Sequence, residues 1–156
     1  MVTNKNTKLS ASLEDYLEAI FNLASKADAV RSKDIAELLG VSRSSVTGAL
    51  RALKQRGLVN YAPYDYVTLT KSGQVEAAEV VKKHNILKSF FINVLGVDTD
   101  IAQQAACKAE HGLGPSVISR LLHFIEFTTK RNRNGQDVAR QFQKFCKSRI
   151  KEKALR

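Results

Sequence analysis

The sequence contains no long uninterrupted apolar stretch. No apolar run reaches the roughly 18 residues that a membrane-spanning helix needs. The N-terminal stretch MVTNKNTKLSASLEDY also lacks the apolar core of a signal peptide. The hydrophobic content of 44% is ordinary for a globular chain and argues against disorder throughout. We therefore expect a cytoplasmic protein that does not interact with membranes.

Cysteine is scarce as well, because only Cys107 and Cys146 occur among the 156 residues. Two cysteines are too few for a small fold stabilised by disulfides, and their number fits a reducing compartment. We expect Cys146 to be an inert thiol, whereas Cys107 lies in a motif that is considered below.

Acidic residues are outnumbered, since 25 Lys and Arg face 15 Asp and Glu and give a net charge of +10. Such a charge predicts a polyanionic partner, for which DNA is the usual candidate. Residues 128–156 hold ten basic and two acidic residues, so that this segment carries +8 of the total. Net charge alone therefore does not locate a DNA-reading surface. The basic segment either adds phosphate contacts or forms a solvated helix.

Apolar residues recur at helical spacing along most of the chain, which predicts a mostly α fold. Three helices are expected first, with Ser12, Ser32 and Ser42 as their N-caps and Gly40 and Gly57 ending the second and third. Two strands at 58–61 and 66–70 then enclose a turn with Pro63 and Asp65. Later helices are expected over 71–95, 98–111, 115–127 and 137–150.

This order of helix, tight turn, helix and hairpin is that of a winged helix-turn-helix, which we predict over residues 1–72. Ala36, Gly40 and Val46 stand where the motif needs a small packing residue, a glycine turn and an apolar plug. The N-terminal end of the third helix enters the major groove in this motif. The expected DNA contacts are Ser42, Arg43, Ser44, Ser45, Thr47 and Arg51, with Tyr64 and Tyr66 from the hairpin.

The stretch CKAEHGLG contains a possible metal-binding motif. Cys107, Glu110 and His111 follow one another at spacings i, i+3 and i+4, so they share one face of a helix. A thiolate, a carboxylate and an imidazole on one face can bind a transition metal. The alternative is a core cysteine beside two polar residues, because free cysteines are often buried.

Two other places offer ligands of the same kind. Asp15 and Glu18 are three residues apart on the first helix, and His84 lies in VKKHNIL on a later one. Each has a structural explanation when it is taken alone. Asp15 and Glu18 can be helix-capping or solvated acids, and His84 can be a surface histidine beside Lys82 and Lys83.

Together these stretches resemble the diphtheria toxin repressor and manganese transport regulator family of metal-dependent transcription factors. The resemblance runs from about Leu9 to Phe127 and includes LEDYLEAIF, DIAELLGVSRSSVT, KKHNIL, LGVD and CKAEHGLG. It implies a homodimeric, non-enzymatic repressor that binds divalent metal and then double-stranded operator DNA. It also implies an all-helical dimerisation and metal-binding domain over 73–127, followed by a basic C-terminal helix over 128–156. The implied metal ligands are Asp15, Glu18, His84, Cys107, Glu110 and His111.

The identity of the metal depends on an unusual mixture of ligands. The family's iron-responsive branch has cysteine at the position of Cys107 but methionine at that of Asp15, whereas its manganese branch has acids at both. Carboxylates suit Mn²⁺, and the softer thiolate shifts the preference toward Fe²⁺. We therefore expect Fe²⁺ to be slightly favoured over Mn²⁺. An ancillary metal site of the iron branch is expected to be lost, because Lys88 and Gln103 replace its ligands.

Two alternative functions remain at this stage. The first is a winged-helix regulator without metal, in which Cys107 senses oxidants. The second is an enzyme that uses Cys107 and His111 as a nucleophile and base, but no third orienting group is evident. We therefore expect the protein not to be an enzyme.

Overall fold

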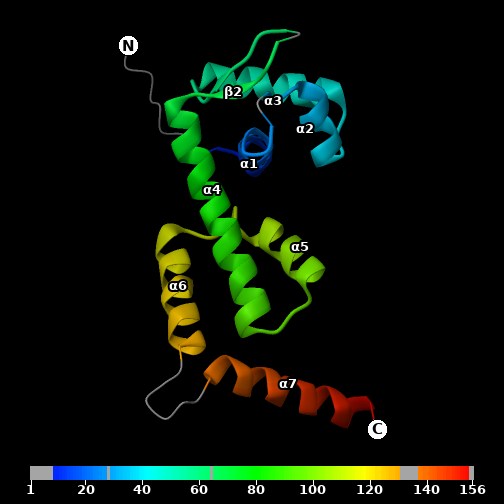
Figure 1. Cartoon of the computed structure of the whole chain (residues 1–156), viewed down its shortest axis with the longest axis vertical. Helices are drawn as coiled ribbons and strands as arrows, with labels where there is room; N and C mark the ends of the chain where they lie inside the picture. The colour runs from blue at the N-terminus through cyan, green and yellow to red at the C-terminus, as the bar shows by residue number, and fades with distance from the viewer. Residues whose placement is uncertain (1–8, 28, 64, 131–136, 155–156) are drawn as a thin grey trace. The chain divides into compact units, whose positions relative to one another are not determined.

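A computed structural model describes residues 9–27, 29–63, 65–130 and 137–154 of the chain (Figure 1). The fold is mostly helical, as predicted. Its contacts divide the chain into two compact units at the boundary between Val81 and Lys82. In chain order the elements are α1 (Ala11–Ala24), α2 (Ser32–Leu39), α3 (Arg43–Gln55), β1 (Val59–Asn60), β2 (Thr68–Leu69), α4 (Lys71–Ser89), the π-helix η1 (Phe90–Val94), α5 (Thr99–Ala109), α6 (Pro115–Thr129) and α7 (Val138–Ala154).

The first unit is built on the apolar faces of α1, α2 and α3. Leu17, Ile35 and Leu50, one from each helix, are fully buried in one shared cluster. Gly40 ends α2 with a φ of 64°, a left-handed conformation that glycine adopts without strain, and so permits the tight turn into α3. Val46 is fully buried against the same cluster. The predicted helix-turn-helix packing is thus observed, and it leaves the opposite face of α3 exposed.

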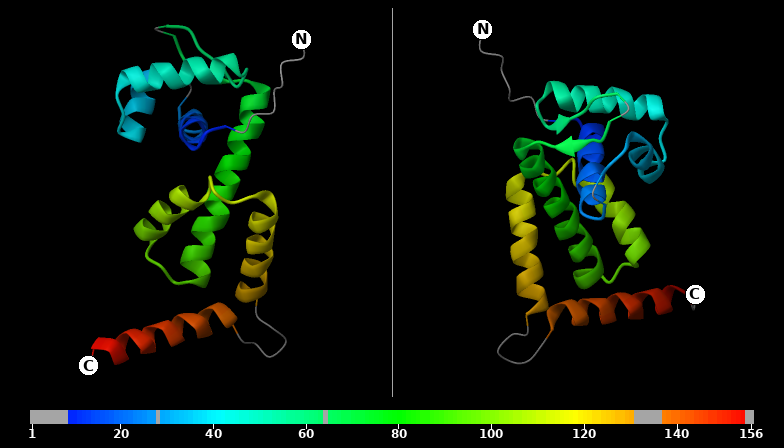
Figure 2. Two further views of the ribbon diagram at one scale, coloured as in Figure 1. Left: turned by 180° about the vertical axis from the view of Figure 1, so that it is seen from behind. Right: turned by 45° about the horizontal axis from the view of Figure 1, so that its top comes forward.

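The hairpin that follows α3 is shorter than predicted. β1 and β2 are antiparallel and pair Val59 with Leu69 and Asn60 with Thr68 (Figure 2). Beyond this register the Val67 amide donates to the carbonyl of Val30, 2.8 Å away, so the ladder is diverted toward the segment before α2. The expected strands at 58–61 and 66–70 are therefore reduced to two residues each.

The helix expected over 71–95 contains a change of helix type. α4 is α-helical to Ser89, and the next five residues form the π-helix η1 before Gly96, with a φ of 70°, ends the segment. A π turn leaves carbonyls without their usual intrahelical partners. The Gln143 side chain of α7 donates to the Asn93 carbonyl at 2.9 Å, which satisfies one of these groups. α7 is thereby attached to η1 within the second unit.

The second unit has its own apolar core, and its other helix boundaries are close to those expected. Ile86, Leu87, Ala106 and Ile118 of α4, α5 and α6 are buried together. Figure 1 shows α5 and α6 beside the later part of α4. None of the helices in the described residues is long and apolar enough to cross a membrane.

Two of the three predicted N-caps were wrong by one or two residues. Ser10, not Ser12, caps α1 and accepts a hydrogen bond from the Leu13 amide at 3.3 Å. Arg31 occupies the N-cap of α2, and Ser32 is the first helical residue. The Asp34 carboxylate accepts from the Arg31 amide at 2.9 Å and supplies the cap interaction instead. Ser42 caps α3 as predicted.

Two helical glycines allow a matched test of packing in the first unit. A Cβ at Gly73 would fall on the carbonyl oxygen of Leu58 and 2.8 Å from its carbonyl carbon, whereas a Cβ at Gly48 would meet no atom within 4 Å. We expect Gly73→Ala to lower the free energy of unfolding by about 1–3 kcal/mol, because backbone atoms must move apart. Gly48→Ala should raise it by up to about 1 kcal/mol, because alanine favours the helix.

Urea denaturation of the metal-free protein, followed by circular dichroism, measures both changes. Equal effects of the two substitutions would contradict the close approach of α4 to Leu58.

Candidate nucleic-acid interface and metal centre

The exposed face of α3 carries the predicted DNA-contacting side chains. Val46, Ala49, Leu50 and Leu53 are buried, so the polar side chains between them point away from the core. Arg43, Ser44, Ser45 and Arg51 are exposed and Thr47 is half-buried. Tyr64, also predicted, lies outside the described residues.

The start of α3 is fixed by a network of hydroxyl groups. The Ser42 Oγ accepts from the Ser45 amide at 3.1 Å and lies 2.8 Å from the hydroxyls of both Ser44 and Ser45. The Thr47 hydroxyl donates to the Arg43 carbonyl at 3.0 Å. In the absence of DNA, these hydroxyl groups cap α3 or hydrogen-bond to its backbone. The backbone amides at this N-terminus are hydrogen-bond donors at the positive end of the helix dipole, and they suit an anionic ligand.

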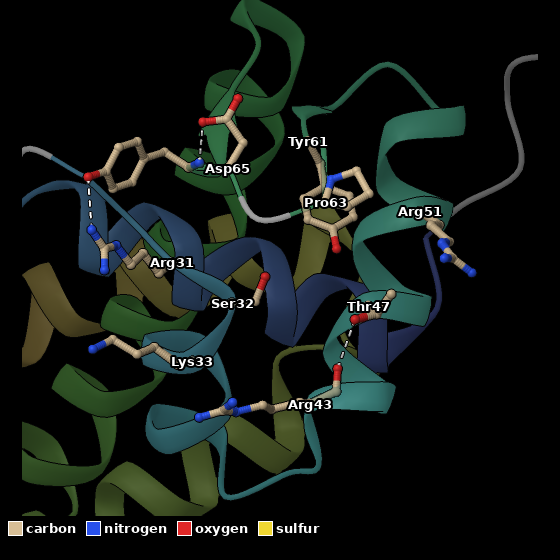
Figure 3. A pocket seen from close by; sticks show the side chains of 10 residues that line it. Arg31, Ser32, Lys33, Arg43, Thr47, Arg51, Tyr61, Pro63 and Asp65 are labelled. Carbon is tan, nitrogen blue, oxygen red and sulfur yellow. Dashed lines mark hydrogen bonds between the residues drawn. The ribbon is translucent and has the colours of Figure 1, made fainter.

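A concave, predominantly basic surface lies between α3 and the hairpin (Figure 3). Arg43, Thr47 and Arg51 line it from α3, and Arg31 and Lys33 line it from the start of α2. The hairpin side is aromatic and polar, and the one acid in the lining is Asp65. Its lining comprises Arg31, Ser32, Lys33, Arg43, Thr47, Arg51, Tyr61, Pro63, Asp65 and Tyr66.

Arg31 connects the start of α2 to the hairpin. Its guanidinium donates to the Tyr66 hydroxyl at 3.0 Å and lies 5.1 Å from the centre of that ring. The hydrogen bond raises the pKa of Arg31 above its usual value, so the group remains a permanent cation. On the other side, the Lys54 ammonium donates to the Tyr61 carbonyl at 2.7 Å. The hairpin is therefore held to both α2 and α3 by basic side chains.

In the second unit, His84 and Glu110 form a buried pair. His84 lies on α4 and is 6% exposed, and Glu110 is the C-cap of α5 and is 1% exposed. The His84 Nδ1 and the Glu110 Oε2 are 2.7 Å apart. The Gln103 side-chain nitrogen lies 2.8 Å from the other ring nitrogen of His84. The buried imidazole thus has a polar partner on each side.

Glu110 has one carboxylate oxygen that the described residues leave unsatisfied. Its Oε1 is buried and accepts no hydrogen bond, although the His111 Nε2 lies 3.5 Å away. A buried acceptor without a partner costs about 1–3 kcal/mol. A divalent cation bound to this oxygen would remove that cost, and a carboxylate beside imidazole nitrogens is a suitable set of donor atoms. The residues present therefore fit a metal ion.

The remaining predicted ligands are distributed over both units. Cys107 is exposed on α5 and forms no disulfide, so it is not the core cysteine of the alternative explanation. His111 follows Glu110 in the turn after α5 and is half-buried. In the first unit, Asp15 and Glu18 are half-buried neighbours on α1. The structure thus brings His84, Glu110 and His111 together within one unit.

Sequence reasoning missed three residues of these surfaces. Arg31 and Lys33 line the basic concavity, and the signal for them was the stretch RSKD at the start of α2. Gln103 contacts His84, but the two residues are separated by 19 positions and lie on different helices. No local spacing reveals such a contact.

Two protein-family models match the chain and together cover most of its length. Residues 8–67 match the model described as iron dependent repressor, N-terminal DNA binding domain. Residues 70–138 match the model described as iron dependent repressor, metal binding and dimerisation domain. The first match contains α3 and β1, and the second contains His84 and the Cys107–His111 stretch.

Individual relatives of the chain are named as transcriptional regulators or repressors. An uncharacterised HTH-type transcriptional regulator of Methanocaldococcus jannaschii is 38% identical over 119 residues, which is 76% of this chain and 95% of the relative. The transcriptional regulator MntR of Salmonella typhimurium is 32% identical over 114 residues, or 73% of this chain and 72% of the relative. A solved manganese-dependent transcriptional repressor in complex with manganese is 30% identical, with a TM-score of 0.68. The chain covers 60% of that protein, and the alignment covers 80% of this chain.

The basic concavity leads to a test by substitution on α3. We expect Arg43→Gln/Arg51→Gln to weaken binding to duplex DNA, because two exposed cations of the lining are lost. The slope of log affinity against log salt concentration is negative, and each lost phosphate contact should reduce its magnitude by about 0.9. Fluorescence anisotropy at several salt concentrations measures both effects.

The matched control for this test is Lys82→Gln/Arg120→Gln, which removes the same charge from exposed positions of the second unit outside the basic segment 128–156. An equal loss of affinity and of salt dependence in both variants would show that only net charge matters, and would contradict a role for this surface.

Proposed function

The chain belongs to the family of iron-dependent repressors, and we propose that it represses genes of metal homeostasis by binding operator DNA as a metal-loaded homodimer. The observation that carries this proposal is the buried Glu110 carboxylate, paired with His84 through one oxygen and unsatisfied at the other. This site lies in the segment that matches the metal-binding and dimerisation domain. The DNA-binding match and the basic concavity of the first unit support the other half of the proposal.

The proposed ligand set contains residues from both units. His84, Cys107, Glu110 and His111 belong to the second unit, and their proximity on α4 and at the end of α5 supports a common site. Asp15 and Glu18 of α1 are added on the family resemblance. A bound ion would supply the positive charge that lets several carboxylates share one site.

Ligands from two units provide a physical route from metal to DNA. Without metal, no shared ion would fix the spacing between the two DNA-binding domains of a dimer. Shared ligation by α1 and by the second unit restricts that spacing, and a two-fold operator selects one spacing. The coupling between metal and DNA binding is typically about 1–3 kcal/mol and acts equally in both directions.

For the DNA side we propose the exposed polar face of α3 together with the basic residues around it. Arg43 is suited to a guanine or a phosphate, and Arg51 to the backbone. Arg31 and Lys33 extend the same basic surface toward the hairpin. We further propose a cytoplasmic location, since operator DNA is the partner. The proposed contacts on α3 are Ser42, Arg43, Ser44, Ser45, Thr47 and Arg51, with Tyr64 from the hairpin.

The metal preference follows from the balance between hard and soft ligands. Asp15, Glu18 and Glu110 offer oxygen atoms, which suit Mn²⁺, and Cys107 offers a thiolate, which favours Fe²⁺. We propose that Fe²⁺ is slightly preferred over Mn²⁺.

Metal-dependent DNA binding is the central test. We expect Mn²⁺, or Fe²⁺ without oxygen, to tighten binding of metal-free protein to promoter DNA from metal-uptake genes by about 5–150-fold, the range that such coupling energies give. Glu110→Gln should abolish this response, because the amide is a poor ligand for the ion. Glu126→Gln, an exposed carboxylate on α6, should leave it intact.

The same titration by fluorescence anisotropy distinguishes the alternative. DNA binding that ignores both metal and chelator, but changes with peroxide and loses that change in Cys107→Ser, would replace the metal sensor with a redox sensor. This alternative is tested because Cys107 is exposed and an oxidant could reach it.

The choice between iron and manganese is tested by changing one donor atom. Cys107→Glu replaces the soft thiolate with a carboxylate, and we expect it to shift the ratio of activating Fe²⁺ and Mn²⁺ concentrations toward Mn²⁺. Cys146→Ser on α7 is the control, because this second cysteine is not among the proposed ligands. A ratio that Cys107→Glu leaves unchanged would remove Cys107 from the ligand set.

A further inference from the structure

Two basic side chains of the helix-turn-helix hold the part of the hairpin that lies beyond its two-residue ladder. At the end of α3, the Lys54 ammonium donates to the Tyr61 carbonyl at 2.7 Å. At the start of α2, the Arg31 guanidinium donates to the Tyr66 hydroxyl at 3.0 Å. All four residues lie in the first unit, so both contacts are properties of that unit alone.

The contact between Arg31 and Tyr66 follows from the register of the backbone. Val30 and Val67 form an antiparallel bridge, in which the Val67 amide donates to the Val30 carbonyl at 2.8 Å. The next opposed pair along these segments is Arg31 and Tyr66, and the side chains of opposed residues lie close together. The guanidinium carbon lies 5.1 Å from the centre of the tyrosine ring, within the range of a cation–π contact. A hydrogen bond and a ring contact therefore join the same two side chains.

The backbone of Arg31 is fixed independently of the hairpin. Arg31 is the N-cap of α2, with φ of −111° and ψ of 153°, and its amide donates to the Asp34 carboxylate at 2.9 Å. Tyr66 lies outside the two-residue ladder and is 47% exposed. The Arg31 side chain therefore ties the outer part of the hairpin to the start of α2.

We propose that Arg31 is a positioning residue for DNA binding, which acts by holding Tyr66 at the edge of the basic concavity, an inference that rests on the DNA-binding function proposed above. Tyr61 and Tyr66 line the concavity from the hairpin, and Arg43 and Arg51 line it from α3. A duplex that contacts both sides at once requires a fixed distance between them. The contribution of Arg31 is then separable from its charge, because it depends on the contact with Tyr66.

Tyr66→Phe tests the proposal without changing any charge, because it removes the hydroxyl and keeps the ring. In saturating Mn²⁺, we expect the affinity for the promoter duplex to fall about 2–10-fold, the factor that corresponds to one hydrogen bond, since the binding-competent hairpin is less populated. The slope of log affinity against log salt concentration should stay unchanged, because no cation is lost. Fluorescence anisotropy at several salt concentrations measures both quantities.

Thr68→Val is the matched control in the same hairpin. The Thr68 hydroxyl accepts from the Asn60 side-chain amide at 3.1 Å, within the ladder that backbone pairing already holds. Valine has the same shape and favours strands, so the control removes one exposed hydroxyl without disturbing the ladder. It should bind the duplex within about twofold of the wild type.

A double-mutant cycle separates positioning from a direct contact of the Tyr66 hydroxyl with DNA. We expect Arg31→Gln to weaken binding, and Arg31→Gln/Tyr66→Phe to bind no more weakly than Arg31→Gln alone, because both substitutions break the same contact. Additive losses would mean that the two side chains act on DNA independently, and would overturn the inference.

Hydrogen exchange of the Val67 amide in the DNA-free protein, followed by nuclear magnetic resonance, reports on the hairpin directly. This amide should exchange faster in Arg31→Gln and in Tyr66→Phe than in the wild type, and at the wild-type rate in Thr68→Val. The amides of α3 should keep their rates in all variants, which separates a loosened hairpin from a general loss of stability. Equal Val67 rates in all four proteins would show that the contact does not hold the hairpin.

A failure of this inference can be told apart from a failure of the proposed function. If metal tightens DNA binding by the wild type and Tyr66→Phe binds equally well, the positioning role is wrong and the repressor function stands. A wild type that does not bind the duplex, with or without metal, would overturn the proposed function and the positioning role with it.

Discussion

The arrangement of the second unit depends on one buried contact, the one between His84 and Glu110. This contact joins α4 to the end of α5, and both side chains are buried, where an unpaired carboxylate would destabilise the fold. The pairing is incomplete, since one oxygen of Glu110 has no hydrogen-bond donor among the described residues. The unsatisfied oxygen of Glu110 therefore lowers the stability of the metal-free fold. Residual cost of this type is common at functional sites.

Much of this molecule could be predicted from sequence because its signals are local. Gly40 and Ser42 correctly predicted the end of α2 and the start of α3. Helical spacing placed Cys107, Glu110 and His111 on one helix, but α5 ends at Ala109, so Glu110 is its C-cap and His111 lies in the following turn. The features that could not be predicted are contacts between distant segments. The bridge between Val30 and Val67 shortens the hairpin, and the contact between Gln103 and His84 joins two helices. The start of α1 was missed for a local reason, because Ser10 and Ser12 are both possible N-caps and Ser10 is the one used.

The π-helix at Phe90–Val94 is another feature that the sequence pattern did not predict. Hydrophobic periodicity predicted one continuous helix, and it cannot distinguish the two helix types over five residues. The wider turn is completed by Gln143, whose side chain donates to a carbonyl 50 positions earlier in the chain. α7 begins where the matched metal-binding and dimerisation segment ends, and yet it completes the backbone bonding of that segment. The basic stretch, for which composition left both phosphate contacts and a solvated helix open, thus belongs to the second unit.

The attachment of the hairpin has a consequence for the thermodynamics of DNA binding. Arg31 stacks on Tyr66 and hydrogen-bonds to it, and Lys54 and Val30 hold other points of the same hairpin. These contacts exist without DNA, so the entropy lost in ordering the contacted hairpin residues is lost during folding and not during association. Segments that must order on binding lower affinity by their ordering cost. DNA binding by the proposed surface should therefore carry no ordering cost from the described part of the hairpin.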